Sequence, residues 1–329
     1  MKTVQKHLLS RSLDGSEQRD YLFDNLKFIL VALVVIGHIV EQYINQAIYL
    51  KAVFVCIYTF HVPLFVFISG YFSKSNKKFS YNVKLLLIPY LVFTLLWRAL
   101  GWARSGTLSL DILSPPFHLW YLLSLFSWRV VIPIIKNMKF SLIFFFFLSL
   151  IFGIFLILGQ LLSLSRTVTL FPFFILGYKC SRSNINVLRN HKLLIIPGLI
   201  MLFISIILTY EFRPENLTML FWNTPYKYTG FFTKGALIAR AILFITAILI
   251  SIVFILITPS RRTLITNAGS RSLQIYILHA FFLEIFVRYF PVWNESIMTN
   301  FSIVLTSFLI IFILSRPFVK TIYDKIFQL

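Results

Sequence analysis

The feature that most constrains this chain is a series of long apolar runs that recurs along almost its whole length. A run of about 20 apolar residues is long enough to cross the hydrocarbon core of a bilayer as a helix. Lipid cannot satisfy free backbone polar groups, so such runs must form helices. We therefore predict an all-α, polytopic integral membrane protein with about ten transmembrane helices. The expected spans are residues 24–44, 52–72, 83–102, 117–135, 140–158, 167–179, 193–210, 236–257, 272–290 and 299–315.

The composition supports lipid as the solvent of this chain. Of its 329 residues, 58% are hydrophobic and only 13% are charged, which is about half the charged share of a soluble domain. The formal net charge of +20 would suggest a nucleic-acid partner for a soluble chain. Here the basic residues fall between apolar runs, so we interpret them as anchors to anionic membrane lipid and expect no nucleic-acid partner.

The basic residues also give the predicted spans a direction. The N-terminal segment, the loops after even-numbered spans and the C-terminal segment, with their flanking span ends, hold 22 of the 31 Lys and Arg residues. Because basic residues are retained on the cytoplasmic side, we expect both chain ends to be cytoplasmic. No linker or charge block marks a second domain. Residues 1–22 are therefore expected to form a cytoplasmic segment, and residues 23–329 a single transmembrane domain.

The first predicted span carries the most informative polar residues. Lys27 and His38 are eleven positions apart, which places both side chains on nearly the same helix face, roughly 16 Å apart along the axis. Asp24 lies near that face too, and Glu41 follows one turn after His38. Ionisable residues at membrane depth are costly, so this polar stripe is a candidate functional site.

Three further histidines lie in or at the ends of apolar runs. With the predicted topology, His61 and His118 fall in the outer half of the membrane, as His38 does. His279 lies about two turns into the ninth run, and structural and catalytic interpretations are equally open for it. A lone histidine in a membrane is often a hydrogen-bonded packing residue. Three histidines could also bind zinc, but the sequence contains no His-x-x-x-His spacing, and no metal is expected.

The loop after the second predicted span is basic and contains Lys77, Lys78 and Lys84. This charge is compatible with simple anchoring at the cytoplasmic face. It would also suit a phosphorylated ligand, because clustered cations attract phosphates. The sequence has no glycine-rich phosphate loop and no Gly-x-Ser-x-Gly elbow. Any chemistry must therefore depend on histidines, basic residues and a few carboxylates.

These motifs, taken in order, resemble the membrane acyltransferase 3 family. The family's first helix has a basic residue, ten intervening residues and a histidine, a spacing that Lys27 and His38 reproduce. Four further segments resemble a branch of the family described as fucose 4-O-acetylase-like. They are His61-Val62-Pro63-Leu64-Phe65, Pro89-Tyr90, His118-Leu119-Trp120-Tyr121 and Ile275-Tyr276-Ile277-Leu278-His279. The resemblance extends from residue 23 to residue 279. Many members carry Arg-x-x-Arg after the second helix, whereas this chain reads Tyr81-Asn82-Val83-Lys84.

The resemblance implies that acetyl-CoA is the cytoplasmic acyl donor and that the acceptor is a hydroxyl of a cell-surface polysaccharide or lipid-linked glycan precursor. It also implies that His38 is the essential residue. We expect His38 to act as general base, oriented by a carboxylate, with Glu41 a nearer candidate than Asp24. The residues expected to hold the donor's phosphates are Lys27, Lys77, Lys78 and Lys84. The residues expected to bind the glycan are His61, His118, Trp120, Tyr121 and His279.

The family also implies a bacterial plasma membrane, and a homo-oligomer is compatible with the sequence. Two other classes of function remain open from the sequence. One is an exporter or flippase of a polysaccharide precursor with a histidine proton relay. The other is a non-catalytic membrane subunit of a glycan-assembly complex, in which the histidines are packing residues.

Overall fold

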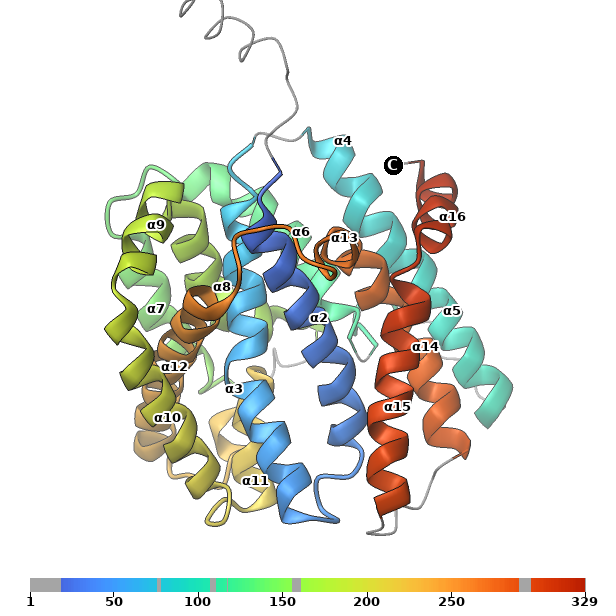
Figure 1. Cartoon of the computed structure of the whole chain (residues 1–329). Helices are drawn as coiled ribbons and strands as arrows, with labels where there is room; N and C mark the ends of the chain where they lie inside the picture. Colours follow the sequence, from blue (N-terminus) through green and yellow to red (C-terminus); the bar gives the residue numbers. More distant parts are fainter. Residues whose placement is uncertain are drawn as a thin grey trace, which may run out of the picture.

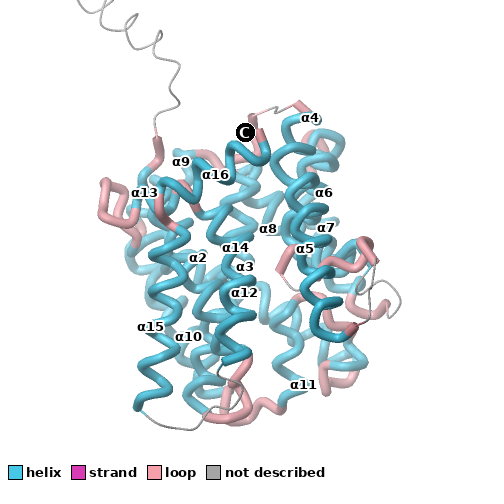
Figure 2. The backbone as a smooth tube through the Cα atoms, turned by 90° about the vertical axis from the view of Figure 1, so that its right-hand side faces the viewer, coloured by secondary structure: helices cyan, strands magenta, loops and turns pink. Residues whose placement is uncertain are grey.

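The computed structural model describes residues 19–75, 78–106, 111–116, 118–155, 161–289 and 297–328. In these residues every regular element is a helix and none is a strand, so the all-α prediction is confirmed. The longer helices run roughly along one axis and form a bundle (Figure 1; Figure 2).

Each predicted span overlaps one of the longer helices. These are α2 (Tyr21–Glu41), α3 (Ile48–Tyr71), α5 (Ile88–Ser105), α6 (Trp120–Ile135), α7 (Ser141–Phe152), α8 (Leu164–Lys179), α10 (Ile195–Leu208), α12 (Thr233–Ile257), α14 (Ser272–Tyr289) and α15 (Ile297–Leu314). The shorter elements are α4 (Phe79–Asn82), the π-helix η1 (Val83–Leu87), η2 (Leu161–Ser163), α9 (Arg182–Asn190), η3 (Lys192–Leu194), α11 (Pro214–Leu217), η4 (Thr218–Phe221), η5 (Tyr226–Tyr228), α13 (Thr266–Gly269) and α16 (Pro317–Phe327).

Several of these helices are long and apolar enough to cross a membrane. Five qualify by length and hydropathy, and the number rises to seven if the bent pairs α9–α10 and α15–α16 each form one span. Three more apolar helices, in α6, α7 and α14, are shorter. Ten crossings therefore stay a prediction. The start of α2 and the C-terminus lie at the same end of the bundle (Figure 1), which is compatible with an even number of crossings.

The perimeter of the bundle is apolar. Ile134 is 77% exposed, Phe203 64% and Phe308 69%. Large apolar side chains spread over a whole surface are unfavourable in water, whereas lipid tails solvate them. Together with the apolar helices, this surface makes the chain a membrane protein.

Helices α3 and α8 approach each other backbone to backbone. A Cβ atom placed on Gly70 would lie 2.0 Å from the carbonyl oxygen of Phe174, and one on Gly177 would lie 1.9 Å from that of Phe67. Only glycine fits at such contacts, as is common where membrane helices pack closely. On the N-terminal side of these glycines, the same two helices supply side chains to one cavity.

Candidate active site

His38 lies at the C-terminal end of α2, where it contacts a carboxylate and a tyrosine. Glu41 is one turn further along the same helix face, and its Oε2 atom is 3.1 Å from His38 Nδ1. From α3, the Tyr58 hydroxyl donates to the same carboxylate oxygen and lies 2.9 Å from His38 Nδ1. Because Glu41 accepts hydrogen bonds, this geometry fits a tautomer with the proton on Nδ1 and the lone pair on Nε2. We call these three residues the His38 group.

The other apolar-run histidines gather around the His38 group. The His279 ring stacks on the His38 ring, with centroids 5.4 Å apart and planes inclined by 13°. The His118 ring lies 5.0 Å from that of His279. His61 is buried and its ring is 4.9 Å from that of Tyr58. The structure thus brings together the four histidines that the sequence places in three separate spans and at the end of a fourth.

Three of these histidines are fixed by backbone carbonyls. Nδ1 of His61 is 2.7 Å from the carbonyl oxygen of Ile57. Nε2 of His118 is 2.9 Å from that of Ile277, and Nδ1 of His279 is 2.6 Å from that of Tyr276. A carbonyl only accepts, so each of these ring nitrogens must carry a proton. The orientation of all three rings is set by these contacts.

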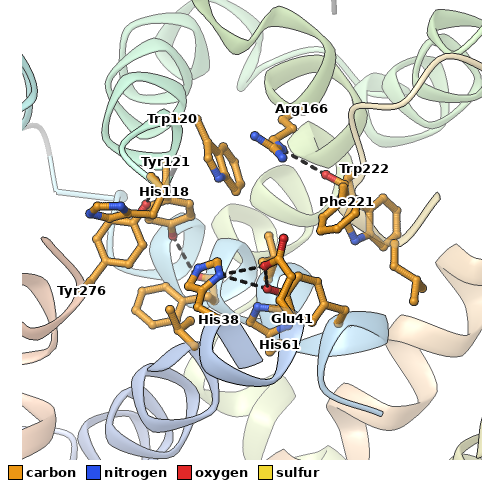
Figure 3. A pocket seen from close by; sticks show the side chains of 15 residues that line it. His38, Glu41, His61, His118, Trp120, Tyr121, Arg166, Phe221, Trp222 and Tyr276 are labelled. Atoms are coloured by element: carbon orange, nitrogen blue, oxygen red, sulfur yellow. Dashed lines mark hydrogen bonds and ion pairs between the residues drawn. The ribbon is translucent and has the colours of Figure 1, made fainter. Parts of the chain in front are cut away.

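A cavity of about 100 Å³ lies beside the His38 group (Figure 3). This volume is several times what one buried water needs, and it leaves room for a small acyl group. We call it the histidine cavity. Its polar and aromatic lining consists of His38, Glu41, Tyr58, His61, Phe65, His118, Trp120, Tyr121, Arg166, Phe221, Trp222 and Tyr276.

Arg166, at the start of α8, is the lining residue that sequence analysis missed. Its Nε atom donates to the carbonyl oxygen of Phe221 at 3.0 Å, and its guanidinium carbon is 4.8 Å from the centre of the Trp120 ring. Figure 3 shows it across the cavity from His38 and Glu41. In the sequence it directly precedes the sixth apolar run, so it resembles a flanking loop residue. The sequence feature that could have indicated its role is its position at the edge of that apolar run.

A second cavity, of about 190 Å³, adjoins the first and is lined by two cations, Lys27 and Arg129. Phe65, Tyr121 and Tyr276 line both cavities and form the wall between them. We call the second one the basic cavity. Clustered cations of this kind suit phosphate groups.

Arg129 of α6 is held in place by two polar side chains. It donates to Asn82 Oδ1 at 3.0 Å and to Ser73 Oγ at 3.2 Å. Neither partner is a carboxylate, so its positive charge is not neutralised by these contacts. An arginine within an apolar helix is costly and marks a candidate ligand site.

Three other predicted residues, Asp24, Lys78 and Lys84, do not line the histidine cavity. Asp24 binds Lys27 at 3.0 Å and Arg19 at 2.6 Å near the start of α2, and it does not line the histidine cavity. Lys78 and Lys84 are exposed, and neither lines the basic cavity. Lys77 lies outside the described residues. Within the described residues, no group of three or more His, Cys, Asp or Glu side chains is placed to hold a metal ion.

Comparisons with known proteins identify a family. The family model described as an acyltransferase domain, of the acyltransferase 3 type, matches residues 20–316. Nodulation protein NolL of Mesorhizobium japonicum is 39% identical over 98 residues, which are 28% of this chain and 26% of that protein. Nodulation protein NolL of Sinorhizobium fredii is 42% identical over 65 residues, 19% of this chain and 18% of that protein. The chain thus aligns with about a quarter or less of these relatives. No solved structure matches it.

Proposed function

We propose, because the chain belongs to the acyltransferase 3 family and is an acyltransferase, that it moves an acetyl group from acetyl-CoA to a glycan hydroxyl. The acceptor would be a cell-surface polysaccharide or a lipid-linked glycan precursor. The observation that carries this proposal is the His38 group, which lies beside a cavity with room for a small acyl group.

His38 would act as the general base. With Nδ1 held by Glu41, the Nε2 atom would take the proton from the acceptor hydroxyl as its oxygen attacks the thioester carbonyl. Glu41 would orient the ring and stabilise the imidazolium that forms, and Tyr58 would hold the carboxylate in place. His279 stacks on His38 and does not line the histidine cavity, which suits a positioning role better than direct contact with the glycan.

The donor would enter through the basic cavity. Lys27 and Arg129 would bind its phosphates, and Asp24 would hold Lys27 in position. Only the thioester end would pass the wall between the two cavities. The exposed Lys78 and Lys84, together with Lys77, would attract the anionic donor over a longer range.

The acceptor would bind at the Glu41 end of α2. There Trp120 and Tyr121 offer aromatic faces on which a sugar ring can stack, and His61 and His118 offer polar edges. In this arrangement the chain crosses a bacterial plasma membrane about ten times with both ends in the cytoplasm, so donor and acceptor approach from opposite sides.

Export through a histidine proton relay is less well supported. His61, His118 and His279 each bind a backbone carbonyl. A carbonyl oxygen accepts a hydrogen bond but cannot pass a proton on, so at these nitrogens the contacts hold the rings and offer no onward path for a proton.

The direct test is acetyl transfer by the purified protein in lipid nanodiscs. Labelled acetyl-CoA would be supplied with methyl α-L-fucoside and a panel of other methyl glycosides. We expect transfer by the wild type and a rate about 10²- to 10⁴-fold lower for His38→Gln. His191→Gln is the matched control, because His191 is exposed and lines neither cavity. Equal transfer by His38→Gln would exclude His38 as the base, and no transfer by the folded wild type would contradict the function.

A further inference from the structure

The histidine cavity contains a balanced pair of fixed charges. Among its described lining residues, Glu41 is the only carboxylate and Arg166 the only lysine or arginine. Figure 3 shows them on opposite sides of the cavity, with the His38 ring on the Glu41 side. While His38 is neutral, the two charges compensate each other.

Arg166 keeps hydrogen-bond donors that face this cavity. Its Nε atom is used by the carbonyl of Phe221, and the Trp120 ring lies against the guanidinium. In the described part of the chain, its Nη1 and Nη2 atoms make no hydrogen bond. A guanidinium presents such donors in a rigid planar fork and stays charged at any ordinary pH.

Acyl transfer would create a second pair of charges in this space. The acceptor oxygen forms a bond to the thioester carbon while His38 Nε2 takes the hydroxyl proton. The π electrons of the carbonyl move to its oxygen, so an imidazolium and an oxyanion appear together. The imidazolium forms next to Glu41. The oxyanion must form elsewhere, because two negative charges close together in a site of low dielectric repel strongly.

We propose that Arg166 is a catalytic residue that stabilises this oxyanion by donating from its Nη atoms. The inference rests on the proposed function and adds the residue that receives the developing negative charge. In the intermediate the four charges would then alternate in sign: negative Glu41, positive imidazolium, negative oxyanion and positive Arg166. When the intermediate collapses, the carbon–sulfur bond breaks, and the departing thiolate takes the proton from His38 Nε2. The products are the O-acetyl ester and free CoA, with Arg166 unchanged.

A purely structural role is the competing explanation. Arg166 contacts Phe221 and Trp120, so it could serve only to hold the cavity wall. Arg240 of α12 offers a matched comparison. It is buried, donates to the carbonyl of Met219, and its guanidinium carbon is 5.4 Å from the centre of the Trp222 ring, yet it does not line the cavity. It supports the same element, η4, without lining the histidine cavity.

The test measures kcat and KM for acetyl-CoA and methyl α-L-fucoside in Arg166→Met, Arg166→Lys and Arg240→Lys. Loss of one oxyanion donor typically lowers kcat by about 10²- to 10³-fold. We expect a loss of that size in Arg166→Met, with both KM values within about threefold of the wild type, because the interaction strengthens only in the transition state. Arg166→Lys should lose at least about tenfold, since an ammonium cannot reproduce the planar fork. Arg240→Lys should stay within about threefold.

The outcomes distinguish a failure of the role of Arg166 from a failure of the proposed function. A normal kcat with raised KM in Arg166→Met, or an equal loss of kcat in Arg240→Lys, would overturn the role of Arg166 while leaving the proposed function intact. If Arg166→Met does not fold, the kcat of Arg166→Lys tests the proposal instead. A normal kcat in folded Arg166→Lys overturns the proposal. Restoration of Arg166→Ala by millimolar methylguanidinium, without effect on Arg240→Lys, would support it. A wild type that transfers no acetyl group contradicts the proposed function itself.

Discussion

Replacing Glu41 with glutamine tests whether the charge of this carboxylate, rather than its shape, activates His38. Glutamine keeps a similar size and a hydrogen-bond acceptor, but it cannot compensate an imidazolium. The pair is separated by 3.1 Å and its side chains are only 15% and 21% exposed. At that distance an ion pair is worth about 5 kcal/mol for an effective dielectric constant of about 20. A single hydrogen bond to a charged group is worth about 1.5–3 kcal/mol.

These values set the expected range. The two energies correspond to losses of roughly tenfold to several thousandfold in kcat. Because both side chains are largely shielded from solvent, we expect a loss in kcat of about 10²- to 10³-fold. Tyr58→Phe is the matched comparison, because it removes one hydrogen bond from Glu41 and leaves the charge in place. It should cost about tenfold. The assay is initial-rate acetyl transfer in nanodiscs at saturating donor. A Glu41→Gln variant within about threefold of the wild type, or one less impaired than Tyr58→Phe, would refute the reasoning.

The other predictions concern the donor and the packing of the bundle. Arg129→Gln should raise the KM for acetyl-CoA about tenfold, because one charge-assisted phosphate contact is lost; an unchanged value in a donor titration would contradict a donor site in the basic cavity. Lys84→Ala should raise the KM for acetyl-CoA about twofold at low salt and less at 0.5 M salt, as expected for long-range attraction. An increase of the same size at both salt concentrations would contradict long-range attraction by Lys84. Gly177→Val should lower the melting temperature of the purified protein by several degrees or prevent folding, because its side chain would overlap the backbone at Phe67. Gly101→Ala, which meets nothing within 4 Å, is the control, and equal melting temperatures for the two variants would contradict the packing argument.

The sequence could predict the parts of the site that depend on local geometry. His38 and Glu41 are three positions apart on one helix, so their contact follows from helical periodicity. The helices themselves follow from apolar run length. Tyr58 could not be assigned this way, since its contact with Glu41 depends on how α2 packs against α3.

Tertiary packing also decided which basic residues line a cavity. The register with His38 predicts a functional role for Lys27, which does line a cavity, but a different one from His38. The basic loop predicts a donor contact for Lys84, yet its side chain is exposed and does not line the basic cavity. Arg129 and Arg166 are single cations at or inside apolar runs. Their proximity to the cavities depends on helices that are distant in sequence, which periodicity within one helix cannot report.

The wall formed by Phe65, Tyr121 and Tyr276 has a consequence for the cell's energy supply. If donor and acceptor reach this site from opposite sides, these three rings lie between the two entry routes, because they line both cavities. The Tyr121 hydroxyl lies 2.7 Å from Ser69 Oγ, which pins its ring across the passage. Under the proposed function, the rings that admit a thioester would also have to prevent protons from leaking down their gradient. Selection at these positions would favour bulk as well as chemistry, because a smaller side chain that speeds donor entry would also discharge the membrane.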